Sequence, residues 1–208
     1  MGLNITYKVQ DKPNGIAEAF IIAEHFIGGG DVCLILGDNI FHGDICFPSS
    51  VSGAVIYAYK VKDPSAYGVV SMSGSTVISI EEKPKIPKSN YAIPGIYHFD
   101  KNVVKYAKEL TPSARGELEI TDIMKRYMEF GELRVTKLEG VVWLDAGTPE
   151  TLFQASAYVQ TIQERAGIMV GCIEESAYRA KLVTKDQFDS AVSHLPKSAY
   201  RSYLEEVK

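Results

Sequence analysis

The sequence predicts an α/β protein with a Rossmann-like open sheet, mixed but mainly parallel, followed by a C-terminal helical appendage. Three observations support this class. Short apolar runs rich in β-branched residues, such as residues 32–36 and 54–59, alternate with stretches whose apolar residues recur at helical spacing. A hairpin pattern surrounds Ser73-Gly74-Ser75, and from residue 148 onward the spacing is helical. In an open α/β sheet, ligands bind outside the carboxyl ends of the strands.

The predicted strands are short. They cover residues 5–9, 32–36, 54–59, 68–70, 77–81, 92–99, 133–138 and 141–144. The runs 32–36 and 54–59 contain no charged residue, which is typical of strands buried on both faces. The run 5–9 alternates between apolar and polar residues, as a half-buried strand does.

The predicted helices are amphipathic and carry stop signals. They cover residues 16–26, 102–110, 120–130, 151–165, 174–180, 185–194 and 200–207. Gly28-Gly29-Gly30 and Gly131 end two of them, because glycine readily takes the left-handed conformation of a helix C-terminus. We therefore expect an α/β domain over residues 1–166 and a helical segment over residues 167–208.

The composition is that of a globular protein without a surface for polyanions. Apolar residues make up 46% of the chain, charged residues 23%, and the net charge is −4, so nucleic acid is not an expected partner. Cys33, Cys46 and Cys172 show no CxxC spacing, which indicates reduced cytoplasmic thiols and no zinc site. No run of about eighteen apolar residues predicts a membrane span, and the start has no signal-peptide core.

Two aspartates follow directly on apolar strands. Asp38 comes after the run 32–36, and Asp145 comes after residues 141–144. At the carboxyl ends of parallel strands they would face one crevice and could hold Mg²⁺, which takes few protein ligands and completes its octahedron with water and phosphate oxygens. Alternatively each aspartate only caps a helix or a turn, which is common at such positions.

Motifs around these aspartates and elsewhere resemble those of a known family. Leu36-Gly37-Asp38-Asn39 and residues 143–148 (WLDAGT) resemble the metal-binding motifs of sugar nucleotidyltransferases. The likeness extends through residues 7–10 (YKVQ), 13–20 (PNGIAEAF), 63–64 (DP), 67–70 (YGVV), 81–84 (EEKP) and 113–122 (SARGELEITD). Their joint occurrence in this order resembles the sugar-1-phosphate nucleotidyltransferase family, closest to its glucose-1-phosphate thymidylyltransferase branch.

The resemblance implies the attack of a glucose 1-phosphate oxygen on the α-phosphorus of dTTP, which gives dTDP-glucose and pyrophosphate. Such a transfer needs alignment of two anions and neutralisation of charge, and no protein nucleophile. Asp38 and Asp145 would hold Mg²⁺, and Lys83 would meet the sugar phosphate. The resemblance further implies a homo-oligomer, a tetramer, with the helical tail between subunits.

The resemblance also assigns two groups of binding residues. Gln10 and Gly15 match positions that read the thymine, although an Asn-Gly turn also explains Gly15. The residues that match positions around the sugar are Asn39, Tyr67, Gly68, Glu82 and Ile93. The run Glu81-Glu82-Lys83 could instead be a solvated strand end. Tyr97 and Trp143 are interpreted as core aromatics, and Arg115 as an exposed lead-in to a helix.

The sequence departs from the family in two places. The family opens with a strand and a glycine-rich loop that wraps the triphosphate, and residues 1–5 begin after the point where that segment would stand. A partner could supply it, the sequence could be incomplete, or the chain could be a degenerate homologue. Residues 42–53 are too few for the helix that the family carries there. These departures leave open a non-catalytic sugar-nucleotide-binding or regulatory homologue. A related uridylyl or adenylyl transferase, which would differ mainly in the choice of base, is a further alternative.

Overall fold

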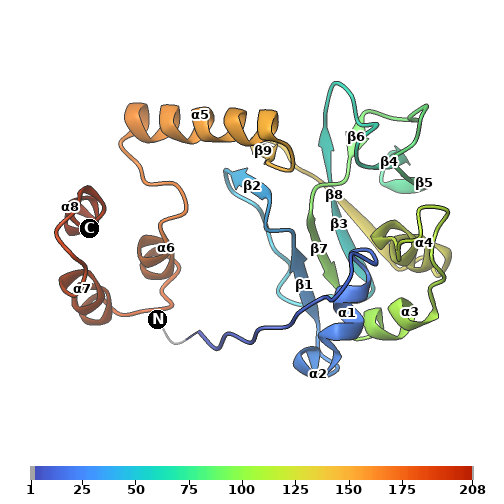
Figure 1. Cartoon of the computed structure of the whole chain (residues 1–208), viewed down its shortest axis with the longest axis horizontal. Coiled ribbons are helices and arrows are strands. Elements are labelled where there is room, and N and C mark those ends of the chain that lie inside the picture. Colours follow the sequence, from blue (N-terminus) through green and yellow to red (C-terminus); the bar gives the residue numbers. More distant parts are fainter. Residues whose placement is uncertain (1–2, 208) are drawn as a thin grey trace. The chain divides into compact units, whose positions relative to one another are not determined.

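The computed structural model describes residues 3–207, and their contacts divide them into two compact units. One unit is Thr6–Gly147, which holds all the strands of the described chain. The other combines residues 3–5 with residues 148–207 and is helical (Figure 1).

The larger sheet of the first unit is mixed. Its strands are β1 (Val32–Ile35), β3 (Ala54–Lys60), β4 (Gly68–Ser73), β5 (Thr76–Glu82), β6 (Tyr91–Ala92), β7 (Ile96–Phe99) and β8 (Leu133–Lys137). They follow the order β1-β7-β3-β6-β4-β5, with β8 beside β3. Only β3 and β8 pair in parallel in the described chain; the other pairings are antiparallel.

The prediction of a mainly parallel sheet was therefore wrong. After β3 the chain turns back through the β4–β5 hairpin, and β7 then runs opposite to both β1 and β3. A short buried run has the same apolar character in either direction, so the composition of a strand does not reveal the direction of its neighbour.

Two predictions about strands near the start were also wrong. Residues 5–9 form no strand, and Tyr7 and Val9 are 85% and 79% exposed. No strand within residues 3–207 pairs with this segment, so its backbone lacks the ladder that stabilises a strand. Among the described residues β1 pairs only with β7, and Ile35 is 55% exposed, so β1 is not buried on both faces.

Helices cover one face of this sheet (Figure 1). They are α1 (Glu18–Ile22), α2 (Glu24–Ile27), α3 (Val103–Glu109) and α4 (Ile120–Glu129). Phe20, Met124 and Tyr127 pack with Ile56 and Phe99 in one buried cluster. The prediction of a helix over residues 16–26 is confirmed, with a break at Ala23 between α1 and α2.

The opposite face carries a smaller cluster. Val55, Tyr57 and Ile96 are buried there beneath the partly buried Phe41 and Ile45. As expected, residues 42–53 contain no helix. The hydroxyl of Tyr57 donates to the Cys46 carbonyl oxygen at 3.1 Å, which ties this irregular segment to the sheet. The three cysteines are free thiols.

The second unit contains α5 (Pro149–Ala166), α6 (Ile173–Arg179), α7 (Lys185–Ser193) and α8 (Ala199–Glu206). Thr148 and Thr184 begin α5 and α7 with capping boxes, in which side chains satisfy the first backbone N–H groups. Phe188, Val192 and Leu204 form the core of the last three helices. Among the helices of residues 3–207, none is long and apolar enough to cross a bilayer.

We expect Tyr127→Phe to lower the free energy of unfolding by about 1–2 kcal/mol, because the buried phenol donates to Asp100 Oδ1 at 2.7 Å. Asp100 also accepts from the backbone N–H groups of Gly53 and Asn102, so the lost bond weakens a junction between α4 and the start of β3. Urea unfolding measures the change. Tyr106→Phe, on the neighbouring ring of α3, is the control, and an equal loss there would contradict the assignment.

Candidate active site

A two-stranded ribbon brings Asp38 and Asp145 together. β2 (Asn39–His42) pairs antiparallel with β9 (Val142–Asp145), so that Asn39 lies opposite Asp145. The Ala146 N–H donates to the Asp38 carbonyl oxygen at 2.8 Å and closes the end of the ribbon. The two aspartates are neighbours through this antiparallel pairing, and not through the parallel strands that the sequence suggested.

The two carboxylates converge on the backbone of Gly147. An ideal Cβ built there would lie 3.3 Å from Asp145 Oδ1 and 3.5 Å from Asp38 Oδ2. Burial, and next the charge of Asp38, raises the pKa of Asp145, whereas the Gly147 N–H and the Tyr67 hydroxyl act in the opposite direction. Asp145 is partly buried and Asp38 is exposed. Two crowded carboxylates supply oxygen ligands that suit a hard divalent cation.

Asp38 and Asp145 do not belong to a larger cluster of metal ligands in the described chain. No cluster of three or more His, Cys, Asp or Glu side chains suited to a metal occurs within residues 3–207. An ion bound by Asp38 and Asp145 would therefore take its remaining ligands from water or substrate oxygens, as Mg²⁺ commonly does.

Asn39 orients one of the two carboxylates. Its Nδ2 donates to Asp38 Oδ1 at 2.8 Å, and its Oδ1 accepts from the Gly95 N–H at 2.9 Å and from Trp143 Nε1 at 2.7 Å. With three bonds the amide is fixed in one orientation. It therefore serves here to position Asp38 as well as to line the site.

Trp143 was interpreted from sequence as a core aromatic, and it also positions site residues. Its indole N–H holds Asn39, and its ring meets Tyr67 edge-on at 4.9 Å between centroids. The sequence contained a signal for this role of Trp143. Residues 143 and 145 stand two apart in one strand, so Trp143 and Asp145 share a face. Trp143 thus links Asn39 and Tyr67 beside Asp145.

Lys83 and Tyr67 lie next to the aspartates. The Lys83 N–H donates to the Tyr67 carbonyl oxygen at 3.0 Å, and Lys83 has a φ of 41°, which is uncommon outside glycine. Burial, and next the charge of Asp145, raises the pKa of Tyr67. The Lys83 charge also helps to lower the pKa of Asp145, so the ammonium group lies close enough to influence that carboxylate.

Gly68, Ile93 and Glu82 form a second group. The Ile93 N–H donates to the Gly68 carbonyl oxygen at 2.8 Å. A Cβ on Gly68 would lie 3.6 Å from Ile93 Cδ1 and 3.7 Å from Glu82 Oε2, so glycine leaves room between them. Tyr97 lies near both this group and Asp38. Burial, and then the charges of Glu82 and Asp38, raise the pKa of its phenol, so both carboxylates lie close enough to act on it.

Gln10 and Gly15 lie together in a third group. Gln10 Nε2 donates to the Gly15 carbonyl oxygen at 3.1 Å and to Glu18 Oε2 at 2.6 Å. The Leu118 N–H donates to the carbonyl oxygen of Asn14, the residue before Gly15, at 2.7 Å. In the described chain no hydrogen bond or ion pair joins Gln10 or Gly15 to Asp38 or Asp145.

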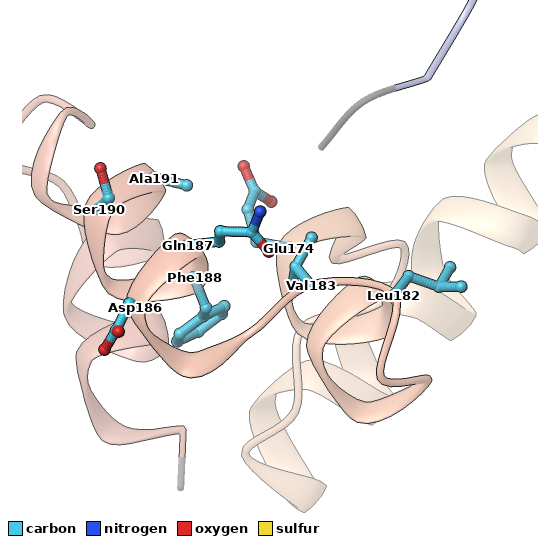
Figure 2. Close-up of a pocket in the computed structure, with 8 residues that line it drawn as sticks. All are labelled: Glu174, Leu182, Val183, Asp186, Gln187, Phe188, Ser190 and Ala191. Carbon is cyan, nitrogen blue, oxygen red and sulfur yellow. The ribbon is translucent and has the colours of Figure 1, made fainter.

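The helical unit has a pocket of its own. It occupies about 640 Å³ between α6 and α7 (Figure 2). Glu174 of α6 and Gln187 of α7 both line it, and Phe188 adds an apolar wall. None of the residues expected at the active site lines this pocket.

The fold is that of a nucleotide-transferring enzyme. The family model described as nucleotidyl transferase matches residues 1–162, so the chain belongs to that family. Among curated relatives, the glucose-1-phosphate thymidylyltransferase of Neisseria gonorrhoeae is 46% identical over 98% of this chain and 73% of its own length. The Mycobacterium tuberculosis H37Rv enzyme of the same name is 44% identical over 100% of this chain and 74% of its own length.

Solved structures agree with the fold. A Bacillus anthracis protein described as a glucose-1-phosphate thymidylyltransferase in complex with sucrose has a TM-score of 0.69 and 46% identity. The similarity covers 76% of this chain and 65% of that one. UDP-glucose pyrophosphorylase complexed with UDP-glucose, with a TM-score of 0.63 and 21% identity over 73% and 65% of the two chains, supports the fold alone.

Proposed function

We propose that the chain belongs to an enzyme that makes dTDP-glucose and pyrophosphate from dTTP and glucose 1-phosphate. The observation that carries this proposal is the convergence of Asp38 and Asp145 beside Lys83, in a chain 42–46% identical to glucose-1-phosphate thymidylyltransferases. The match to this chain covers 73% of the length of the Neisseria gonorrhoeae enzyme and 65% of the Bacillus anthracis structure. The activity of the whole protein therefore stands as a proposal.

In the proposed mechanism, Asp38 and Asp145 would hold Mg²⁺, which would supply positive charge to the phosphate oxygens. Asn39 and Tyr67 hold the two carboxylates in place. Lys83 orients the sugar phosphate so that its oxygen attacks the α-phosphorus of dTTP, and the bond to pyrophosphate breaks as the new P–O bond forms. No covalent intermediate with the protein is required.

The remaining residues select the substrates. Glu82 accepts hydrogen bonds from sugar hydroxyls, and the positions of Gly68, Ile93 and Asn39 leave room for the ring. Gln10 pairs with the edge of thymine, and Gly15 lets the base approach the backbone. The proposal favours thymine over uracil and adenine only through this pair.

We further propose a cytoplasmic homotetramer. Residues 1–166 would form the catalytic domain, and the helical residues 167–208 would contact another subunit. Light scattering tests the assembly, and a monomer at micromolar concentration would overturn it. Neither a membrane nor nucleic acid is part of this proposal.

The function is tested by pyrophosphate release. We expect release from dTTP only when both glucose 1-phosphate and Mg²⁺ are present, with lower rates for UTP and ATP. Calorimetry with dTDP-glucose separates the alternatives: binding without turnover would favour a non-catalytic homologue. The absence of both binding and turnover would overturn the proposal.

A further inference from the structure

Glu119 is a buried acid that the proposed reaction leaves without a role. It is 6% exposed and immediately precedes α4. Its Oε1 accepts from Ser113 Oγ at 2.7 Å and lies 3.6 Å from Arg115 Nη1. The same guanidinium nitrogen lies 3.5 Å from Glu82 Oε1. One arginine nitrogen therefore stands between Glu119 and a residue of the proposed sugar group.

The surrounding loop holds this arginine in place. Ser113 Oγ accepts from the Arg115 N–H at 3.1 Å while its hydroxyl donates to Glu119. Arg115 Nη2 donates to Glu117 Oε1 at 3.0 Å. Backbone bonds from Ser113 to Glu117 and from Gly116 to Ser113 close the loop. Arg115 is thus anchored at its backbone and at its guanidinium group.

We infer that Glu119 is a positioning residue for the sugar group, because together with Ser113 it holds Arg115 beside Glu82 and sets the charge around that carboxylate. This inference rests on the proposed function for its link to sugar binding. The pairing itself is a property of the ligand-free protein. Glu82 and Glu119 share Arg115, so a change of charge at one carboxylate affects the other.

The charged groups around Glu82 determine the direction in which its pKa should change. Burial first, and then the charge of Glu119, raises the pKa of Glu82, whereas the Thr121 hydroxyl, Lys83 and Arg115 act to lower it. The Tyr97 phenol also lies close enough to Glu82 for that charge to act on it, and its own raised pKa keeps it neutral. An ionised Glu82 accepts hydrogen bonds from sugar hydroxyls, so binding weakens as the pH falls through its pKa.

Glu119→Gln removes the charge of the second acid but keeps the shape of the side chain and an amide oxygen that still accepts from Ser113 and Arg115, so Arg115 stays beside Glu82. We expect the pKa of Glu82 to fall by about half a unit or more, and the acid limb of glucose 1-phosphate binding to move to lower pH by the same amount. Arg115→Gln should raise the pKa of Glu82 and move the acid limb of glucose 1-phosphate binding to higher pH. Glu117→Gln is the matched control: it has the same partner, Arg115, but is not among the charges that shift Glu82.

Two measurements separate the inference from the proposed function. A carboxyl-detected NMR titration of the ligand-free chain follows Glu82, with its signal assigned by its loss in Glu82→Gln. Calorimetry with glucose 1-phosphate as a function of pH follows binding. If Glu119→Gln leaves the pKa of Glu82 unchanged, the inference is overturned. It is also overturned if that pKa changes while the pH dependence of glucose 1-phosphate binding stays the same. Absence of glucose 1-phosphate binding by the unaltered chain at every pH overturns the proposed function instead.

Discussion

Asp38→Asn is expected to reduce the rate of pyrophosphate release by at least about a hundredfold. The substitution keeps the volume of the side chain and removes one of the two negative charges that converge on Gly147. With Asp145 as the remaining acidic ligand, affinity for a divalent cation falls, and so does neutralisation of charge on the reacting phosphate. Initial rates at saturating dTTP and glucose 1-phosphate, over a range of Mg²⁺ concentrations, measure the effect.

Binding and stability distinguish this role from a structural one. Mn²⁺ binding, followed by electron paramagnetic resonance, should weaken in Asp38→Asn, while the melting temperature stays the same or rises because a like-charge contact with Asp145 is lost. Asp189→Asn is the control, since it removes only an exposed pair with Lys185 in α7. Full activity in Asp38→Asn, or equal losses in both variants, would contradict the assignment.

Much of the local structure could be predicted because local signals agree with the tertiary contacts. The amphipathic stretch of α4 ends at Gly131, whose φ of 69° requires a residue that tolerates the left-handed region. The Ser73-Gly74-Ser75 turn joins β4 and β5 as expected. In these elements a few neighbouring residues determine both the conformation and its end.

Long-range pairing could not be predicted in the same way. Nothing within residues 39–42 or 142–145 states that β2 and β9 pair antiparallel, yet that pairing brings Asp38 to Asp145. The position of each aspartate directly after an apolar run, together with the family resemblance, singled out both residues, whereas the local pattern gave the wrong strand direction. Glu119 escaped notice for a related reason, because Glu82, with which it shares Arg115, stands on a distant strand.

Gly15→Ala is expected to lower the free energy of unfolding by about 3 kcal/mol or more and to weaken dTTP binding. Gly15 has a φ of +107°, and a Cβ there would lie 2.4 Å from the Leu118 carbonyl oxygen. That oxygen also accepts from the Ala17 N–H at 3.2 Å, so its displacement disturbs the start of α1. Urea unfolding and calorimetry with dTTP measure the two effects.

Gly116→Ala separates backbone strain from the close approach. Gly116 has a φ of +78° in the same loop as Leu118, but no atom lies within 4 Å of its ideal Cβ. Alanine there meets only the cost of the left-handed conformation, about 1–2 kcal/mol. Equal destabilisation by the two substitutions would mean that the contact with Leu118 contributes nothing. A larger loss at Gly15, with dTTP binding lost there and kept in Gly116→Ala, would show that close packing of the two segments maintains the proposed base-binding group.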